Sequence, residues 1–151
     1  MSGTTVKKTL QFSVQIQAAP ERVWQMLQDD QAYRDWTSAF CEGSHFEGAW
    51  EEGAAIRFLS PKGDGICAEI AQSRPPEFLS IRHLGEVQAG IDVTESAEVR
   101  AWAPAYENYH FLKQVDGTEL RVVVETLPDF EAYMQRTFPL ALGRLKALCE
   151  A

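Results

Sequence analysis

Alternating hydrophobic and polar residues form the first clear pattern in the chain, over residues 9–17. Leu10, Phe12, Val14 and Ile16 occupy every second position there, with polar side chains between them. A period of two places successive side chains on opposite faces of a β-strand. The pattern therefore predicts a strand with one buried face.

The next segment, "AAPERVWQMLQDD", has the longer period of a helix. Pro20 suits the first helical position, because the hydrogen that its nitrogen lacks would be unpaired there anyway. Asp29 or Asp30 can cap a second short helix, "QAYRDW", in which Tyr33 and Trp36 lie one turn apart. Two short helices are expected after the first strand.

Residues 44–125 return to strand patterns. Six segments read as strands separated by turn residues: "SHFEGAW", "AAIRFLS", "GICAEIAQS", "EFLSIRHLG", "YENYHFLKQV" and "TELRVVVET". "PKGDG" and "VDGT" supply the glycine and aspartate that hairpin turns favour, and the prolines of "RPPE" indicate a corner. A meander of antiparallel strands is the simplest topology.

Residues 86–105, between two of these strands, are too numerous for a hairpin loop. Asp92 and Glu95 have the spacing of a capping box ahead of "TESAEVRAW", and Pro104 would end such a helix. We expect a small helical insertion here. Its Trp102 would be the apolar contact of a lid over a cavity, or else the anchor of a plain surface helix.

The longest helical pattern is "FEAYMQRTFPLALGRLKALC", which covers residues 130–149 and can be capped by Asp129. Its apolar stripe consists of Phe130, Met134, Phe138, Ala141, Leu145 and Leu148. Pro139 removes a backbone hydrogen bond near the middle and is expected to bend the helix. A bent helix follows a curved sheet, which offsets the cost of the proline. The alternative is that a second helix starts at Pro139.

Together these elements predict an α+β fold in a single domain, residues 1–151. A curved antiparallel sheet of about seven strands wraps around the long C-terminal helix, and two short helices follow the first strand. A chain of 151 residues with 45% hydrophobic content suits one core. The net charge of −8 disfavours nucleic acids and anionic membranes as partners, which leaves small molecules or a protein surface.

Metal, cofactor and membrane signals are weak. Cys41, Cys67 and Cys149 do not have the spacing of a disulfide framework or a zinc site, and no HxH or HExxH spacing occurs. No stretch reaches the roughly 18 apolar residues of a membrane span. We therefore expect a cytoplasmic protein that needs no metal or cofactor.

Three segments resemble a known superfamily: "AAPERVW" after the first strand, "ENYHFLKQVDGTELRV" as the last hairpin, and "FEAYMQRTFPLALGRLKALCE" as the final helix. They are similar to the START-like, or SRPBCC, superfamily, which includes the birch-pollen allergen. The resemblance covers residues 10–150, and within the superfamily it is nearest to the branch named for homology to the activator of the 90-kDa heat-shock protein ATPase. It implies a helix-grip fold with a cavity between helix and sheet, which in many members holds an apolar or amphipathic ligand.

Alternation along the strands and the helical stripe assign side chains to the space between helix and sheet. The candidates for a ligand cavity are Trp24, Trp36, Phe58, Ile66, Ile81, His83, Tyr109, Phe111, Val122, Phe130, Met134 and Phe138. So many aromatic side chains are typical of a ligand pocket. The alternative is that the same residues fill a dry core.

His83 is the strongest polar candidate for a functional residue. It occupies the same alternate positions of its strand as Leu79 and Ile81 and should therefore face inward. It would act as a base or hold the polar end of a ligand. A lone histidine at a strand end is more often simply half-exposed. The hydroxyl of Tyr109 would need a partner inside a cavity, for which His83 is a candidate.

Three hypotheses of function follow. The first is a carrier or sensor that binds an apolar or aromatic small molecule, and it makes no claim of catalysis. The second, from the resemblance, is a module that interacts with a chaperone or another protein. The third is a cyclase or dehydratase type of enzyme. A pocket without charge favours the first hypothesis, an exposed apolar or acidic patch the second, and a polar triad around His83 the third.

Overall fold

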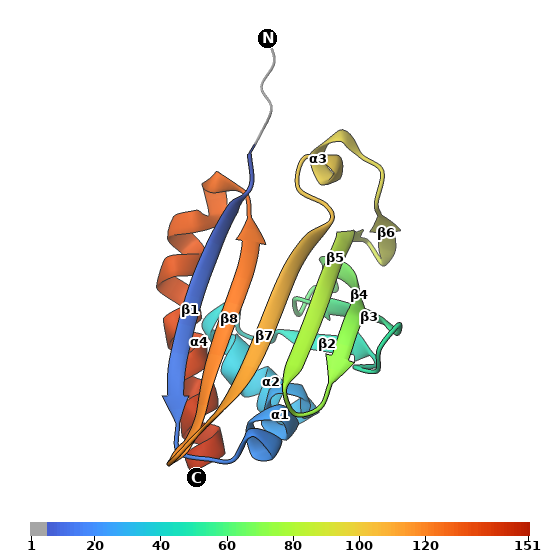
Figure 1. The fold of residues 1–151 in the computed structure, drawn as a ribbon. Helices are drawn as coiled ribbons and strands as arrows, with labels where there is room; N and C mark the ends of the chain where they lie inside the picture. The colour runs from blue at the N-terminus through green and yellow to red at the C-terminus, as the bar shows by residue number, and fades with distance from the viewer. Residues whose placement is uncertain (1–5) are drawn as a thin grey trace.

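The computed structural model describes residues 6–151 and has an α+β fold (Figure 1). Its strands are β1 (Lys8–Ile16), β2 (His45–Gly48), β3 (Ala55–Leu59), β4 (Gly65–Arg74), β5 (Phe78–Gln88), β6 (Ile91–Val93), β7 (Ala105–Gln114) and β8 (Gly117–Thr126). Its helices are α1 (Pro20–Gln28), α2 (Asp30–Trp36), α3 (Ala97–Arg100) and α4 (Glu131–Glu150), with 3₁₀ turns η1 (Thr37–Ala39) and η2 (Pro128–Phe130).

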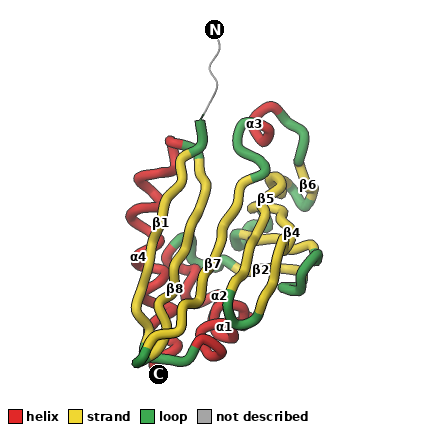
Figure 2. The backbone as a smooth tube through the Cα atoms, viewed as in Figure 1, coloured by secondary structure: helices red, strands yellow, loops and turns green. Residues whose placement is uncertain are grey.

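One curved antiparallel sheet contains all the strands of the described residues, in the order β1-β8-β7-β5-β4-β3-β2, with β6 paired to β5 at the side. The register between β4 and β5 shifts twice, and such bulges bend a sheet. Helices α1, α2 and α4 lie behind the sheet in Figure 2, whereas α3 lies at one end beside β6. The predicted fold class is confirmed, and β6 is the strand that the sequence pattern did not predict.

The face of α4 that packs on the sheet follows the predicted stripe over its second half. Its buried residues are Thr137, Phe138, Ala141, Leu142, Leu145 and Cys149. The ring of Phe138 stacks on that of Phe12 in β1, with 4.9 Å between the ring centroids. At the other end of the stripe, Phe130 is 51% exposed. The stripe therefore passes from closed core to an open region as it approaches the start of the helix.

Pro139 lies inside a helix that continues on both sides of it, so the alternative of a second helix starting there is wrong. Pro139 and Gln135 are both exposed. Water can therefore reach the Gln135 carbonyl that the proline leaves without a partner. The bend itself stays a prediction. The predicted cap is also wrong, because Asp129 lies within η2 and no side chain caps α4 at Phe130.

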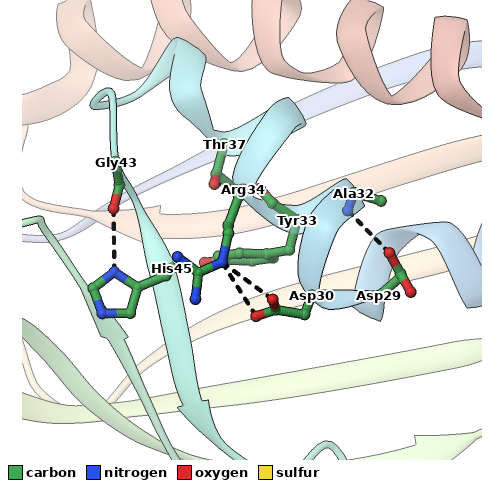
Figure 3. A network of polar contacts seen from close by, with 8 residues as sticks. All are labelled: Asp29, Asp30, Ala32, Tyr33, Arg34, Thr37, Gly43 and His45. Atoms are coloured by element: carbon green, nitrogen blue, oxygen red, sulfur yellow. Dashed lines mark hydrogen bonds and ion pairs between the residues drawn. The ribbon is translucent and has the colours of Figure 1, made fainter.

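The short helices α1 and α2 meet at Asp29 (Figure 3). Its backbone is extended and its Oδ2 accepts a hydrogen bond from the Ala32 backbone N–H at 3.0 Å, which makes it the cap of α2. Asp30 instead pairs with Arg34 one turn later, at 3.2 Å. Of the two predicted caps, Asp29 is the one in use.

The insertion differs from its predicted form. Residues 86–88 extend β5, which turns into β6, and helix α3 has only four residues. Asp92 cannot cap it, because it lies in β6 and pairs with Arg57 at 2.7 Å. The cap is Ser96, whose hydroxyl accepts from the Val99 N–H at 3.1 Å. The helical part of the insertion is therefore shorter than predicted and starts later.

A single arginine fastens α1 to the end of α4. The Arg22 guanidinium donates to the backbone carbonyls of Cys149 at 2.7 Å, Leu148 at 3.3 Å and Ala151 at 3.4 Å. These carbonyls have no partner within the helix and carry its negative partial charge. A cation placed there satisfies both needs and joins two elements that are far apart in sequence.

We expect Arg22→Ala to lower the free energy of unfolding by about 1–2 kcal/mol, since it removes charged hydrogen bonds at a helix end. The matched control is Arg34→Ala, whose exposed ion pair within one helix should contribute less than about 0.5 kcal/mol. Urea unfolding of both variants measures the difference. Equal losses would show that Arg22 is an ordinary surface arginine.

Candidate functional site

A cavity of about 720 Å³ lies between α4, α2 and the inner face of the sheet. Its aromatic lining consists of Tyr33, Trp36, Phe40, Trp50, Phe58, Trp102, Tyr109, Phe130, Tyr133 and Phe138. The first half of α4 and the turns on either side of β2 supply many of these rings. The cavity therefore lies where α4 leaves the closed core, next to the exposed Phe130.

Nine of the twelve candidate residues line this cavity: Trp36, Phe58, Ile66, Ile81, His83, Tyr109, Phe130, Met134 and Phe138. Three do not. Trp24 and Phe111 pack on each other, with 5.1 Å between ring centroids, where α1 covers β7, and Val122 is fully buried in the core. The alternation of side chains identified the residues that face inward. It did not show at which point along the sheet the helix moves away from the strands. That the nine residues bind a ligand stays a prediction.

The polar centre of the cavity is Glu107 on β7. Its Oε1 lies 3.0 Å from Nε2 of His83 on β5, and its Oε2 accepts a hydrogen bond from the hydroxyl of Tyr109. Ile81 pairs with Glu107 across the two strands, so His83 approaches the carboxylate from the diagonal position. The expected partner of Tyr109 was His83, and this is wrong: both residues bond to Glu107 instead.

Glu107 was missed, although the sequence carried a signal for it. Glu107, Tyr109 and Phe111 occupy alternate positions on one strand, so an inward Tyr109 implies an inward Glu107. A glutamate in such a place is normally assigned to solvent, since burying a carboxylate is costly unless it is paired. Here two donors supply the pairing.

Burial and the charge of Glu107 both change the pKa values of two tyrosines at the cavity, Tyr33 and Tyr109. Burial, followed by the negative charge of Glu107, raises the pKa of Tyr33 and of Tyr109 well above the ordinary value. The hydrogen bond to Glu107 adds to the effect at Tyr109. Both rings therefore stay neutral, and Tyr109 acts as a donor to the carboxylate.

An alkaline titration tests this arrangement. A tyrosine whose pKa is raised in the folded state contributes stability that is complete below the unfolded pKa of about 10 and is lost as the pH rises above it. We expect Tyr33 and Tyr109 to ionise only as the protein unfolds above about pH 10, seen as phenolate absorbance that appears together with loss of circular dichroism. Absorbance of all four tyrosines rising before any loss of structure would contradict this.

Two residues that line the cavity each have a buried side-chain nitrogen without a hydrogen-bond partner within residues 6–151: Nδ1 of His83 and Nε1 of Trp50. Nε1 of Trp36, by contrast, is paired, since it donates a hydrogen bond to the Leu27 carbonyl at 3.2 Å. Native proteins rarely leave such atoms unpaired. Almost none of the surface of either nitrogen is accessible, so both are closed off from the open space of the cavity.

Tyr33, Phe40 and Trp50 also escaped the sequence prediction of the site. The ring of Tyr33 contacts those of Trp50 and Phe58, at 5.9 and 6.0 Å between centroids. Tyr33 carried a signal, since it lies one turn before Trp36 on the same short helix. Phe40 and Trp50 lie in turns, where no periodic pattern assigns a direction to a side chain.

The rim of the cavity is acidic on the side of the insertion. Asp64, Glu86 and Glu125 contribute to it, and Lys7 lies 3.8 Å from Glu125. Trp102 of the insertion also lines the cavity, whereas Glu95 and Glu98 of the insertion are exposed. The lid stays a prediction. Within residues 6–151, no group of three or more potential metal ligands occurs, and no helix is long and apolar enough to cross a bilayer.

No protein-family model matches the chain, and no curated protein matches it significantly. Solved structures do. An Aha1 dimer from Colwellia psychrerythraea superposes with a TM-score of 0.73 at 18% identity, over 95% of this chain and 96% of that one. The fold is START-like. This START-like architecture, also called SRPBCC, is the one that the sequence resemblance implied, with Aha1 among its structural relatives.

Two further solved structures match as well. Protein MLL2253 from Mesorhizobium loti has a TM-score of 0.69 at 17% identity, over 93% of this chain and 96% of that one. DynU16, from the dynemicin biosynthetic locus, has a TM-score of 0.68 at 17% identity, over 95% of this chain and 47% of that one. At these identities the comparison establishes the fold.

Proposed function

We propose that the protein binds a small molecule whose apolar, aromatic body occupies the cavity and whose polar end reaches the His83–Glu107–Tyr109 cluster. One observation carries the proposal: a largely aromatic cavity of about 720 Å³ that ends at a half-buried, hydrogen-bonded polar group. Ligand sites in proteins are typically of roughly 300–1,000 Å³, with apolar walls and a few convergent polar groups. The cavity has both properties.

Native mass spectrometry of freshly purified protein tests the proposal directly. We expect a fraction of the molecules to carry an added mass of drug-like size, which denaturation releases. Binding of an environment-sensitive apolar dye is the second measurement, and it does not depend on a ligand surviving purification. Protein that carries no added mass and never binds the dye would refute the proposal.

A second candidate function is acid–base catalysis within the same cavity. It is favoured by Glu107 itself, because the cavity contains a carboxylate bonded to a histidine, and the cavity is not free of charge as the carrier hypothesis expected. A retained ligand distinguishes the two functions: a carrier releases it unchanged, whereas an enzyme converts an excess of it. Glu107→Gln should then abolish the conversion.

The fold likeness supports a ligand-binding or chaperone-related domain in general. The chaperone alternative rests on the likeness to Aha1. A substitution that fills the cavity distinguishes ligand binding from a chaperone-related function. It should abolish ligand binding and leave binding of a chaperone to the protein surface unaffected. The variant Met134→Trp, which places an indole in the cavity, makes that comparison.

A further inference from the structure

We infer that the polar end of the ligand is a cation, an ammonium group attached to an apolar aromatic body, and that Glu107 is the residue that binds it. This specificity rests on the proposed function and adds the charge of the ligand to it. Three features of the cavity support it: the charges of its lining residues, the accessible side chain of Glu107 and the aromatic wall around Tyr33.

The lining of the cavity is negatively charged. Within residues 6–151 it includes four carboxylates and two imidazoles, and neither a lysine nor an arginine. The carboxylates are those of Asp64, Glu86, Glu107 and Glu125. An anionic ligand would lose its hydration and face these charges, whereas a cationic ligand is attracted by all of them.

Few cationic side chains offset these carboxylates. Among the residues that the structure describes, only Glu125 has a lysine or arginine at salt-bridge distance, which is Lys7 at 3.8 Å. Glu86 accepts a hydrogen bond from a side-chain amide, and Asp64 accepts one from a backbone N–H. Glu107 is bonded to a phenol hydroxyl and an imidazole. Most of the negative charge at the cavity is therefore available to a ligand.

Glu107 is the carboxylate that a ligand can reach at the polar end of the cavity. Its side chain lines the cavity and is 23% exposed. A carboxylate has about four positions at which it accepts hydrogen bonds, and Tyr109 and His83 each occupy one. An ammonium group only donates hydrogen bonds and therefore matches the unused positions, whereas a carboxylate on the ligand would only accept.

The aromatic wall around Tyr33 also favours a cation. Tyr33 lines the cavity and is only 8% exposed, yet its hydroxyl has no hydrogen-bond partner within residues 6–151. Unlike Nε1 of Trp50, this hydroxyl keeps accessible surface, so its oxygen can accept from an ammonium group. Tyr33 packs on Trp50 and Phe58, which line the same cavity. The faces of such rings carry negative partial charge and attract cations.

Three probes with the same ring system test the inference: 2-naphthylethylamine is a cation, 2-naphthylethanol is neutral and 2-naphthylacetate is an anion. The measurement is made at about pH 8, above the range where an ordinary imidazole titrates. We expect the wild-type protein to bind the amine at least about tenfold more tightly than the alcohol, as a charged hydrogen bond would give. The acetate should bind at least about tenfold more weakly than the alcohol. Fluorescence titration measures the three dissociation constants.

Glu107→Gln should abolish the preference for the amine by weakening amine binding alone. The affinity of the variant for the alcohol, expected to be unchanged, shows that its cavity is intact. The control variant is Glu119→Gln, the same substitution at a glutamate outside the cavity that pairs with Arg121 at 2.9 Å. It should keep the preference.

A comparison at low salt and at 1 M NaCl needs no variant. Salt at 1 M screens exposed charges beyond about 3 Å, and it affects partly buried pairs much less. We therefore expect an amine bound at Glu107 to keep most of its preference over the alcohol. A preference that disappears at 1 M NaCl would place the cation at the exposed rim and contradict binding by Glu107.

The outcomes separate this inference from the proposed function. If the wild-type protein binds the alcohol or the acetate as tightly as the amine, or if Glu107→Gln keeps the preference, the inference is wrong and the proposed function stands. If none of the three probes binds, the proposed function fails and the inference fails with it.

Discussion

Met134→Trp should abolish binding of an environment-sensitive apolar dye and leave the free energy of unfolding within about 1 kcal/mol of wild type. Met134 lines the cavity from α4 and is only partly buried, so an indole side chain can extend into open space instead of overpacking a core. The occupied volume is then no longer available to a ligand. Dye titration and thermal unfolding of the variant make the paired measurement.

The matched control for this variant is Leu140→Trp. Leu140 lies on the same helix and is 59% exposed, so the same indole points to solvent and should leave dye binding unchanged. A loss of about 1–3 kcal/mol in Met134→Trp, the usual cost of overpacking, would show that the space is already filled. Dye binding that survives the substitution would place the ligand elsewhere.

Leu145→Ala should lower the free energy of unfolding by about 3 kcal/mol, whereas Leu140→Ala should change it by less than about 0.5 kcal/mol. Both substitutions remove the same atoms from the same helix. Leu145 is fully buried in the part of α4 that follows Pro139, and Leu140 is exposed. The large loss is expected because the deletion leaves a cavity in a packed core.

Urea unfolding measures both variants, with the slope of the transition as a check that the unfolded states are comparable. The pair tests whether α4 remains docked on the sheet beyond the proline. Similar small losses for both variants would mean that the helix after Pro139 is not held in the core.

The pattern of hydrophobic positions was sufficient for the order of the longer elements, but not for β6. Each long strand has its own period of two, and a helix such as α1 or α4 has its own apolar stripe, so these features depend mainly on nearby residues. Where elements are short the local signals compete. The insertion illustrates this: Asp92 and Ser96 are both good caps, and the pairing of β6 with β5 removed Asp92 from the choice.

For the candidate site, the sequence by itself determined which side chains face inward, including His83, Tyr109, Met134 and Phe138. Only the tertiary structure decided where the inward faces separate to leave a cavity, why Trp24 and Phe111 lie outside it, and that Glu107 joins His83 to Tyr109. The physical reason is that a side chain's direction follows from its own backbone. Empty volume and a shared hydrogen-bond partner depend instead on the distances between strands and helices that are remote in sequence.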